Sequence, residues 1–100
     1  MNFYKYHGLG NDYIVMNPAE MGKELTNDQI RRICHRNYGI GSDGILWGPV
    51  NGAQVPFRVK IYNPDGSEAE KSGNGLRIFA RYLMDNGLVS EDPFLISTIG

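Results

Sequence analysis

The chain has 100 residues, a formal net charge of −1 and 41% hydrophobic residues. This balance gives no electrostatic basis for binding nucleic acid or an anionic membrane, and it is typical of a globular chain rather than a disordered one. Cys34 is the only cysteine, so neither an internal disulfide nor a thiolate metal cluster is expected. Because no stretch resembles a transmembrane span or a signal peptide, we expect a cytoplasmic location.

Short runs rich in β-branched and aromatic residues predict several strands. Aromatic and polar side chains alternate over residues 3–7, and residues 13–16 form a second apolar run, whereas residues 18–25 are expected to be irregular. Over residues 55–62 every second side chain is apolar, which predicts a strand with one face in water. Two further strands are expected over residues 45–47 and 94–99.

Two helices are predicted between these strands. Thr26 and Gln29 have the spacing of a capping box at the start of the first helix, and Gly39 is expected to end it. Cys34 lies on the apolar face of this helix and is expected in the core. The second helix, over residues 74–86, has such a wide apolar surface that it should be largely buried.

Together these elements predict an α+β fold in which a curved, mostly antiparallel, barrel-like sheet surrounds a central buried helix. The chain stops at Gly100, directly after an apolar strand. We therefore expect a truncated chain, a proteolytic piece or one half of a two-part protein.

Three glycine-rich loops, over residues 8–12, 39–44 and 63–75, are the candidates for chemistry. Each follows a strand or helix end, so a closed sheet would bring them together at one rim. Taken singly, each is most simply a turn. The third loop ends at Ser72-Gly73-Asn74, where a helix should begin, and its unpaired N–H groups would favour a carboxylate or phosphate. The simpler alternative is an ordinary helix start with Ser72 or Asn74 as the N-cap.

Residues 63–77, Asn-Pro-Asp-Gly-Ser-Glu-Ala-Glu-Lys-Ser-Gly-Asn-Gly-Leu-Arg, closely resemble the signature of the diaminopimelate epimerase family. In that family a cysteine begins a Cys-Gly-Asn-Gly helix start, where this chain has Ser72. Residues 7–12 and 36–44 resemble the opening and second motifs of the family. The resemblance implies two similar halves, each a barrel-like sheet around a central helix, with the active site between them. Residues 1–100 would then be most of the N-terminal half, and the C-terminal half is absent from this chain.

The resemblance also implies an activity, the interconversion of LL- and meso-diaminopimelate on the route to lysine and peptidoglycan precursors. The family uses neither pyridoxal phosphate nor a metal. Two cysteines, one from each half, exchange the α-proton on opposite faces of the substrate. The expected partners are therefore an amino-acid substrate and the C-terminal half, and a homodimer is a further candidate.

Carried over by position, the resemblance assigns roles to five residues. Asn11 and Asn63 would bind the distal amino-acid end or orient the substrate. Gly73 and Asn74 would offer backbone N–H groups to the α-carboxylate, and Ser72 stands at the position of the base.

Ser72 is the main departure from the family pattern, because a serine hydroxyl is far less acidic than a thiol and needs a partner base. Three interpretations stay open: an engineered Cys→Ser change, a natural racemase-like or isomerase-like relative, and a domain that binds an amino acid without turning it over. Glu68 is the best alternative base. His7 and His35 have no ligands at metal-binding spacing, so no metal site is expected.

Overall fold

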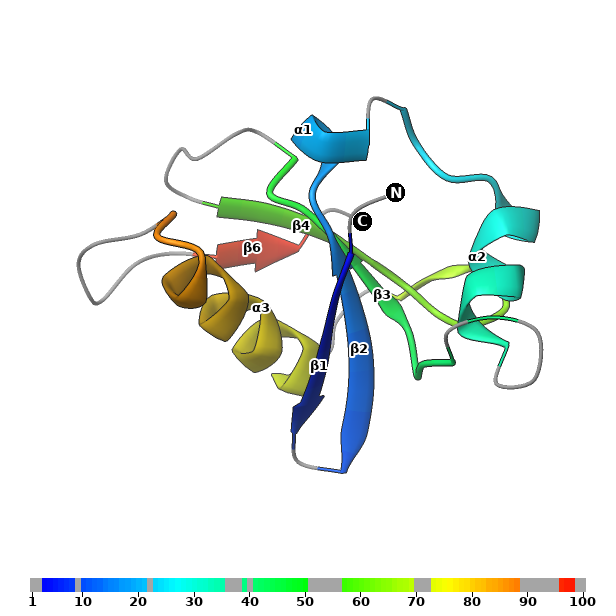
Figure 1. The fold of residues 1–100 in the computed structure, drawn as a ribbon, viewed down its shortest axis with the longest axis horizontal. Helices are drawn as coiled ribbons and strands as arrows, with labels where there is room; N and C mark the ends of the chain where they lie inside the picture. Colours follow the sequence, from blue (N-terminus) through cyan, green and yellow to red (C-terminus); the bar gives the residue numbers. More distant parts are fainter. Residues whose placement is uncertain are drawn as a thin grey trace.

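Six strands and three helices make up the part of the chain that the computed structural model describes, residues 3–8, 10–21, 23–35, 39, 41–50, 57–69, 73–88 and 96–98 (Figure 1). In chain order they are β1 (Tyr4–Gly8), β2 (Asn11–Met16), α1 (Pro18–Met21), α2 (Asn27–Cys34), β3 (Ile45–Trp47), β4 (Phe57–Tyr62), β5 (Glu68–Ala69), α3 (Gly73–Asp85) and β6 (Ile96–Thr98). None of the helices in these ranges is long and apolar enough to cross a membrane.

The sheet has the order β1-β2-β3-β4-β5, with β6 paired to β4. The α+β class is confirmed, and three of the five strand pairs, β1–β2, β3–β4 and β4–β5, are antiparallel as expected, whereas β2–β3 and β4–β6 are parallel. Parallel neighbours need a crossover connection, and here α2 lies between β2 and β3 while α3 lies between β4 and β6. Within the described residues β1 and β5 are not paired with each other, so closure of the sheet into a barrel around α3 stays a prediction.

The two crossover helices lie on opposite sides of the sheet (Figure 1). Side chains alternate between the faces of a strand, so each helix packs on its own set of strand residues. The core on the α3 side consists of Tyr13, Val15, Leu46, Phe57, Val59, Ile61, Ile78, Phe79, Tyr82 and Leu83. The core on the α2 side consists of Ile14, Met16, Ile30, Cys34, Ile45, Trp47 and Tyr62.

The α2 core corrects the expectation that β4 has one face in water. Arg58 is exposed and Lys60 is half-buried, as expected, but Tyr62 is buried under α2. The described part of this strand begins at Phe57. Cys34 is 4% exposed, which confirms its place in the core.

The start of α2 is confirmed and its end is corrected. The hydroxyl of Thr26 accepts from the N–H of Gln29, and the side chain of Gln29 accepts from the N–H of Thr26, as a capping box requires. The helix ends at Cys34 rather than at Gly39. Its last carbonyl groups accept from the following loop, where the N–H of Ser42 lies 3.2 Å from the carbonyl oxygen of Cys34.

Residues 18–25, expected to be irregular, contain the short helix α1. Asn17 caps it, since its side chain accepts from the N–H of Ala19 at 3.0 Å, and Pro18 occupies the first helical position. An Asn-Pro pair that ends a strand therefore also fits a helix start, with Asn as the cap and Pro at the first helical position.

The end of α3 is confirmed at Asn86-Gly87. Gly87 has φ 68°, its N–H donates to Met84, and the N–H of Leu88 donates to the carbonyl of Leu83 at 2.9 Å. These are the two hydrogen bonds of a Schellman motif. The helix buries one face rather than most of its surface, because Met84 on the other face is 51% exposed.

Candidate functional site

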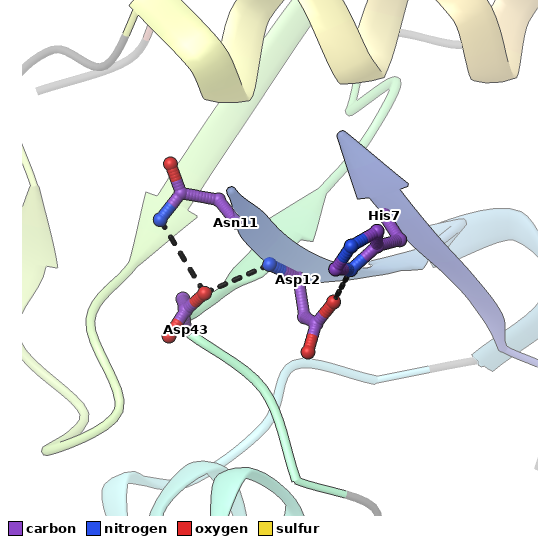
Figure 2. A network of polar contacts seen from close by, with 4 residues as sticks. All are labelled: His7, Asn11, Asp12 and Asp43. Atoms are coloured by element: carbon purple, nitrogen blue, oxygen red, sulfur yellow. Dashed lines mark hydrogen bonds and ion pairs between the residues drawn. The ribbon is translucent and has the colours of Figure 1, made fainter. Parts of the chain in front are cut away.

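The β1–β2 hairpin brings the first glycine-rich loop to one end of the sheet. β1 runs to Gly8 and β2 begins at Asn11, so Asn11 and Asp12 are strand residues rather than loop residues. Adjacent strand residues point to opposite faces, and Asn11 and Asp12 do so (Figure 2). Asn11 shares the α3 side of the sheet with Tyr13, whereas Asp12 shares the α2 side with Ile14.

The second glycine-rich loop is held by a buried hydroxyl. Ser42 is 3% exposed, and its Oγ donates to the carbonyl oxygen of Gly44 at 3.0 Å and accepts from the N–H of Gly44 at 3.3 Å. The carbonyl of Gly44 also accepts from the N–H of Ile14 in β2. This arrangement places the intervening residue, Asp43, beside the start of β2.

The third loop contributes the first turn of α3. Gly73 is exposed, and among the described residues, apart from its chain neighbours and the backbone of its own helix, nothing lies within 4 Å of an ideal Cβ built on it, which leaves this side of the helix start open. Asn74 is half-buried, and its Nδ2 donates to Oδ1 of Asn11 at 2.7 Å. This bond joins residues 63 positions apart in the sequence.

A polar network formed by His7, Asn11, Asp12, Asp43 and Asn74 therefore connects the three loops. Figure 2 shows its part at the hairpin and the second loop, which consists of His7, Asn11, Asp12 and Asp43. Oδ2 of Asp43 accepts from Nδ2 of Asn11 at 3.3 Å and from the backbone N–H of Asp12 at 2.8 Å. The N–H of Asp43 in turn donates to the carbonyl of Asp12 at 2.8 Å. The expectation that the loops meet at one rim is confirmed for Asn11 and Asn74.

His7 belongs to the edge of this network rather than to its centre. Its Nδ1 is bonded to Oδ1 of Asp12, and 77% of its side chain is exposed. Because Asp12 points to the side of the sheet away from α3, the His7–Asp12 pair does not face the start of that helix. Among the described residues no group of three His, Cys, Asp or Glu side chains is placed to hold a metal ion.

Two of the expected site residues lie outside the network. Asn63 is exposed and is held within its own turn, where Nδ2 donates to Oγ of Ser67 at 3.0 Å. The same serine donates to the Asp65 carboxylate and lowers the pKa of that group. Glu68, the alternative base, is exposed on β5 opposite Tyr62. Ser72 lies outside the described residues.

Asp43 and Asp12 were not singled out from the sequence. What the sequence lacked was the pairing of the second glycine-rich loop with β2, which makes Asp12 and Asp43 exchange backbone and side-chain hydrogen bonds.

The arrangement suits a small polar ligand. A helix start with room beside Gly73 presents backbone N–H groups and the positive end of the helix dipole, and the amide pair of Asn11 and Asn74 borders it. Main-chain N–H groups at a helix start, bordered by side-chain amides, are chemically suited to a carboxylate or a similar anion.

Comparison with known proteins specifies the class further. The family model described as diaminopimelate epimerase matches residues 3–100, so the chain belongs to the diaminopimelate epimerase family. It is 64% identical over 100 residues to "Diaminopimelate epimerase 2" of Nostoc sp., covering 100% of this chain and 35% of that protein. It is 42% identical to "Diaminopimelate epimerase" of Moorella thermoacetica, covering 99% of this chain and 36% of the relative. A relative of the same name from Thioalkalivibrio sulfidiphilus is 39% identical, with 98% and 36% covered. The chain thus spans about a third of the length of these curated relatives.

Proposed function

We propose that this chain is the N-terminal part of a cofactor-independent amino-acid epimerase that interconverts LL- and meso-diaminopimelate. The observation that carries the proposal is the 2.7 Å bond between Asn74 and Asn11, which brings two of the three family motifs together at the start of α3. The names of the relatives supply the substrate. The proposal includes a C-terminal half that completes the site and the barrel-like sheet, a cytoplasmic location, and a homodimer as a candidate assembly.

The chemistry needs stabilisation of a carbanion, because the α-proton of an amino acid is a very weak acid. Removal of that proton spreads negative charge onto the α-carboxylate. Backbone N–H groups at a helix start are already oriented toward such charge and need no reorganisation as it develops. In this proposal Gly73 and Asn74 supply those groups, and the open space beside Gly73 admits the carboxylate.

The two asparagines outside the helix orient the substrate. Asn11 lies within hydrogen-bonding distance of Asn74 and so borders the proposed position of the α-carbon. Asn63 stands on an exposed turn after β4 and is assigned the distal amino-acid end. Reaching that end requires a substrate long enough to span the distance between the two sites, as a diamino diacid is.

Ser72 occupies the position of the base and limits the rate. A serine hydroxyl is not deprotonated near neutral pH without a partner base, whereas a thiol at a helix start has a lowered pKa. The opposing proton donor would come from the C-terminal half. The 100-residue chain alone is therefore expected to have no epimerase activity.

The test is α-proton exchange with diaminopimelate in heavy water, using the full-length protein with Ser72 and with Ser72→Cys. We expect Ser72→Cys to start both exchange and inversion of the α-carbon. An epimerisation rate with Ser72 within about tenfold of the cysteine form would contradict the assignment of Ser72 as the limiting group. Asp28→Asn, on the exposed first turn of α2, is the control that should change neither rate.

Two other outcomes separate the alternatives. Exchange of the α-proton without inversion would indicate a one-base isomerase rather than an epimerase. Binding of diaminopimelate without exchange in either form would indicate a domain that only binds an amino acid.

A further inference from the structure

Asp43 holds a central position between the hairpin and the helix start. One oxygen of its carboxylate, Oδ2, accepts two hydrogen bonds, from the side chain of Asn11 and from the backbone of Asp12. Its own N–H donates to the carbonyl of Asp12. Asp43 is therefore fixed to the backbone of β2 in both directions, and its side chain has little freedom to turn away from Asn11.

The carboxylate decides which way the neighbouring amides point. An ionised carboxylate only accepts hydrogen bonds, so Asn11 must turn its Nδ2 toward Asp43. This leaves Oδ1 of Asn11 facing α3, and Asn74 must then present its own Nδ2 to that oxygen. If the Asn11 amide were reversed, its oxygen would face the carboxylate and its N–H groups would face those of Asn74.

We propose that Asp43 is a positioning residue of the site: through Asn11 it fixes the orientation of the Asn74 side chain and the placement of the first turn of α3. Asp43, Asn11 and Asn74 form a one-way series of hydrogen bonds, which we call the amide chain. The consequence for catalysis rests on the proposed function, because it assumes that the N–H groups of Gly73 and Asn74 receive the substrate carboxylate.

The His7–Asp12 pair does not take part in this chain. The backbone of Asp12 bonds to Asp43, whereas its side chain is directed to His7 on the other side of the strand. The orientation of Asn74 should therefore respond to changes at Asp43 and Asn11, and not to changes at His7.

The direct test is spectroscopic and independent of turnover. Side-chain amide signals of Asn74 are recorded by NMR in the full-length protein, in Asp43→Leu, in Asn11→Ala and in the double variant. Leucine has nearly the shape of aspartate but accepts no hydrogen bond. We expect Asp43→Leu to shift the Asn74 signals when Asn11 is present and to leave them unchanged when residue 11 is already alanine. Asp28→Leu, on the exposed start of α2, is the control that should shift nothing.

Two results would overturn the proposal. One is an Asn74 signal that stays the same in Asp43→Leu. The other is a shift of equal size with and without Asn11, which would mean that Asp43 acts on the helix start by another route.

The kinetic test uses the Ser72→Cys protein and compares two changes at one position. Asp43→Leu should lower the kcat of α-proton exchange by about a hundredfold, because a displacement of about 1 Å at a catalytic group has an effect of this size. KM should change little, since the N–H groups act mainly on charge that develops in the transition state.

Asp43→Asn keeps an oxygen that can accept from both Asn11 and Asp12, so it should retain most of the rate of proton exchange. The same variant provides the kinetic comparison with the parent protein if Asp43→Leu does not fold. Equal losses in Asp43→Asn and Asp43→Leu would contradict positioning by this oxygen. A Ser72→Cys protein that exchanges no proton would count against the proposed function alone, because the NMR comparison does not depend on diaminopimelate.

Discussion

At the scale of single residues, Gly44 beside the site leaves no space for a side chain. An ideal Cβ on Gly44 would lie 2.6 Å from the carbonyl oxygen of Tyr62 and 3.0 Å from Cε1 of Tyr13. The first of these is a backbone atom in β4 and cannot move aside without disturbing the sheet. We expect Gly44→Ala to lower the free energy of unfolding by about 1–3 kcal/mol, the usual cost of overpacking. Urea unfolding of the purified chain measures this loss.

Gly73→Ala is the matched control for stability. In the part of the chain that the structure describes, no side chain and no backbone outside the helix start lies within 4 Å of an ideal Cβ at this position, and the residue is helical. Alanine should therefore leave the free energy of unfolding unchanged or slightly higher. If Gly73→Ala lowered the free energy of unfolding as much as Gly44→Ala, the effect of Gly44→Ala would not arise from the contact with Tyr62.

The ionisation of Tyr6 should make the stability of the folded chain depend on pH in the alkaline range. Burial, followed by the hydrogen bond from its hydroxyl to the Asp85 carboxylate, raises the pKa of Tyr6 to about 12 from 10.0. Because the folded pKa is raised, the unfolded chain loses this proton first. The stabilisation is complete below pH 10 and is lost as the pH rises toward about 12. Tyr62 and Tyr82 also have raised pKa values, so they act in the same direction.

Tyr6→Phe isolates the contribution of this hydroxyl. Denaturant unfolding between pH 8 and pH 12 should show a shallower fall in stability for the variant than for the parent chain. Ultraviolet titration of tyrosinate should lose its most alkaline step. The prediction is wrong if both proteins lose stability with the same pH dependence.

The sequence singled out Asn11 and Asn74 as expected site residues but not Asp43, which is bonded to Asn11. Both assignments came from the resemblance of residues 7–12 and 63–77 to the family motifs. The role of Asp43 depends on the pairing of its loop with β2, a contact between residues about 31 positions apart. No local pattern carries that information.

At the scale of elements, α2 determines where the Asp43 loop lies. The carbonyl of Cys34 at the end of this helix accepts from the N–H of Ser42, and Sγ of Cys34 lies 3.2 Å from the hydroxyl of Ser42. The helix has only 8 residues, so its stability depends strongly on its cap. Loosening α2 should therefore loosen the loop as well.

Thr26→Ala tests this dependence. It removes the side chain that accepts from the N–H of Gln29, and loss of such a cap costs about 1 kcal/mol. We expect that loss in urea unfolding, together with faster hydrogen exchange at the N–H of Ser42. Asn27→Ala, on the exposed next position, is the control that should change neither quantity.

Element positions were predicted well where the signal was local. The capping box of α2 and the Asn86-Gly87 end of α3 were both read correctly, because each depends on residues within one turn. The end of α2 was misplaced at Gly39, because the loop over residues 41–44 takes over its last carbonyl groups. That loop is fixed by the sheet, and its effect on the helix is a tertiary one.

At the scale of the whole molecule, the sequence predicted the α+β class and a mostly antiparallel sheet, but not the two parallel strand pairs. Apolar alternation identifies a strand without giving the direction of its neighbour. Here β2–β3 and β4–β6 are parallel because each pair is joined by a crossover, and the two crossovers place α2 and α3 on opposite faces of the sheet (Figure 1). The same arrangement buries Tyr62, which alternation alone assigned to water.

Because β2, β3 and β4 contribute to both cores, the two faces should unfold together. Leu83 is fully buried on the α3 side, and Leu83→Ala should cost about 2–5 kcal/mol, a large part of the stability of a domain this size. Trp47, the only tryptophan, is 2% exposed in the core on the α2 side and reports that face by fluorescence. We expect Leu83→Ala to shift the unfolding midpoint of Trp47 fluorescence as much as that of far-ultraviolet circular dichroism.

Ile30→Ala provides the reverse experiment, because Ile30 is fully buried in the same core as Trp47. It should also shift both midpoints by equal amounts. A Trp47 midpoint that moves with Ile30→Ala but not with Leu83→Ala would mean that the two faces unfold separately. The helix start that carries Gly73 and Asn74 would then be stabilised only by its own core, and α2 would not affect it through the shared strands.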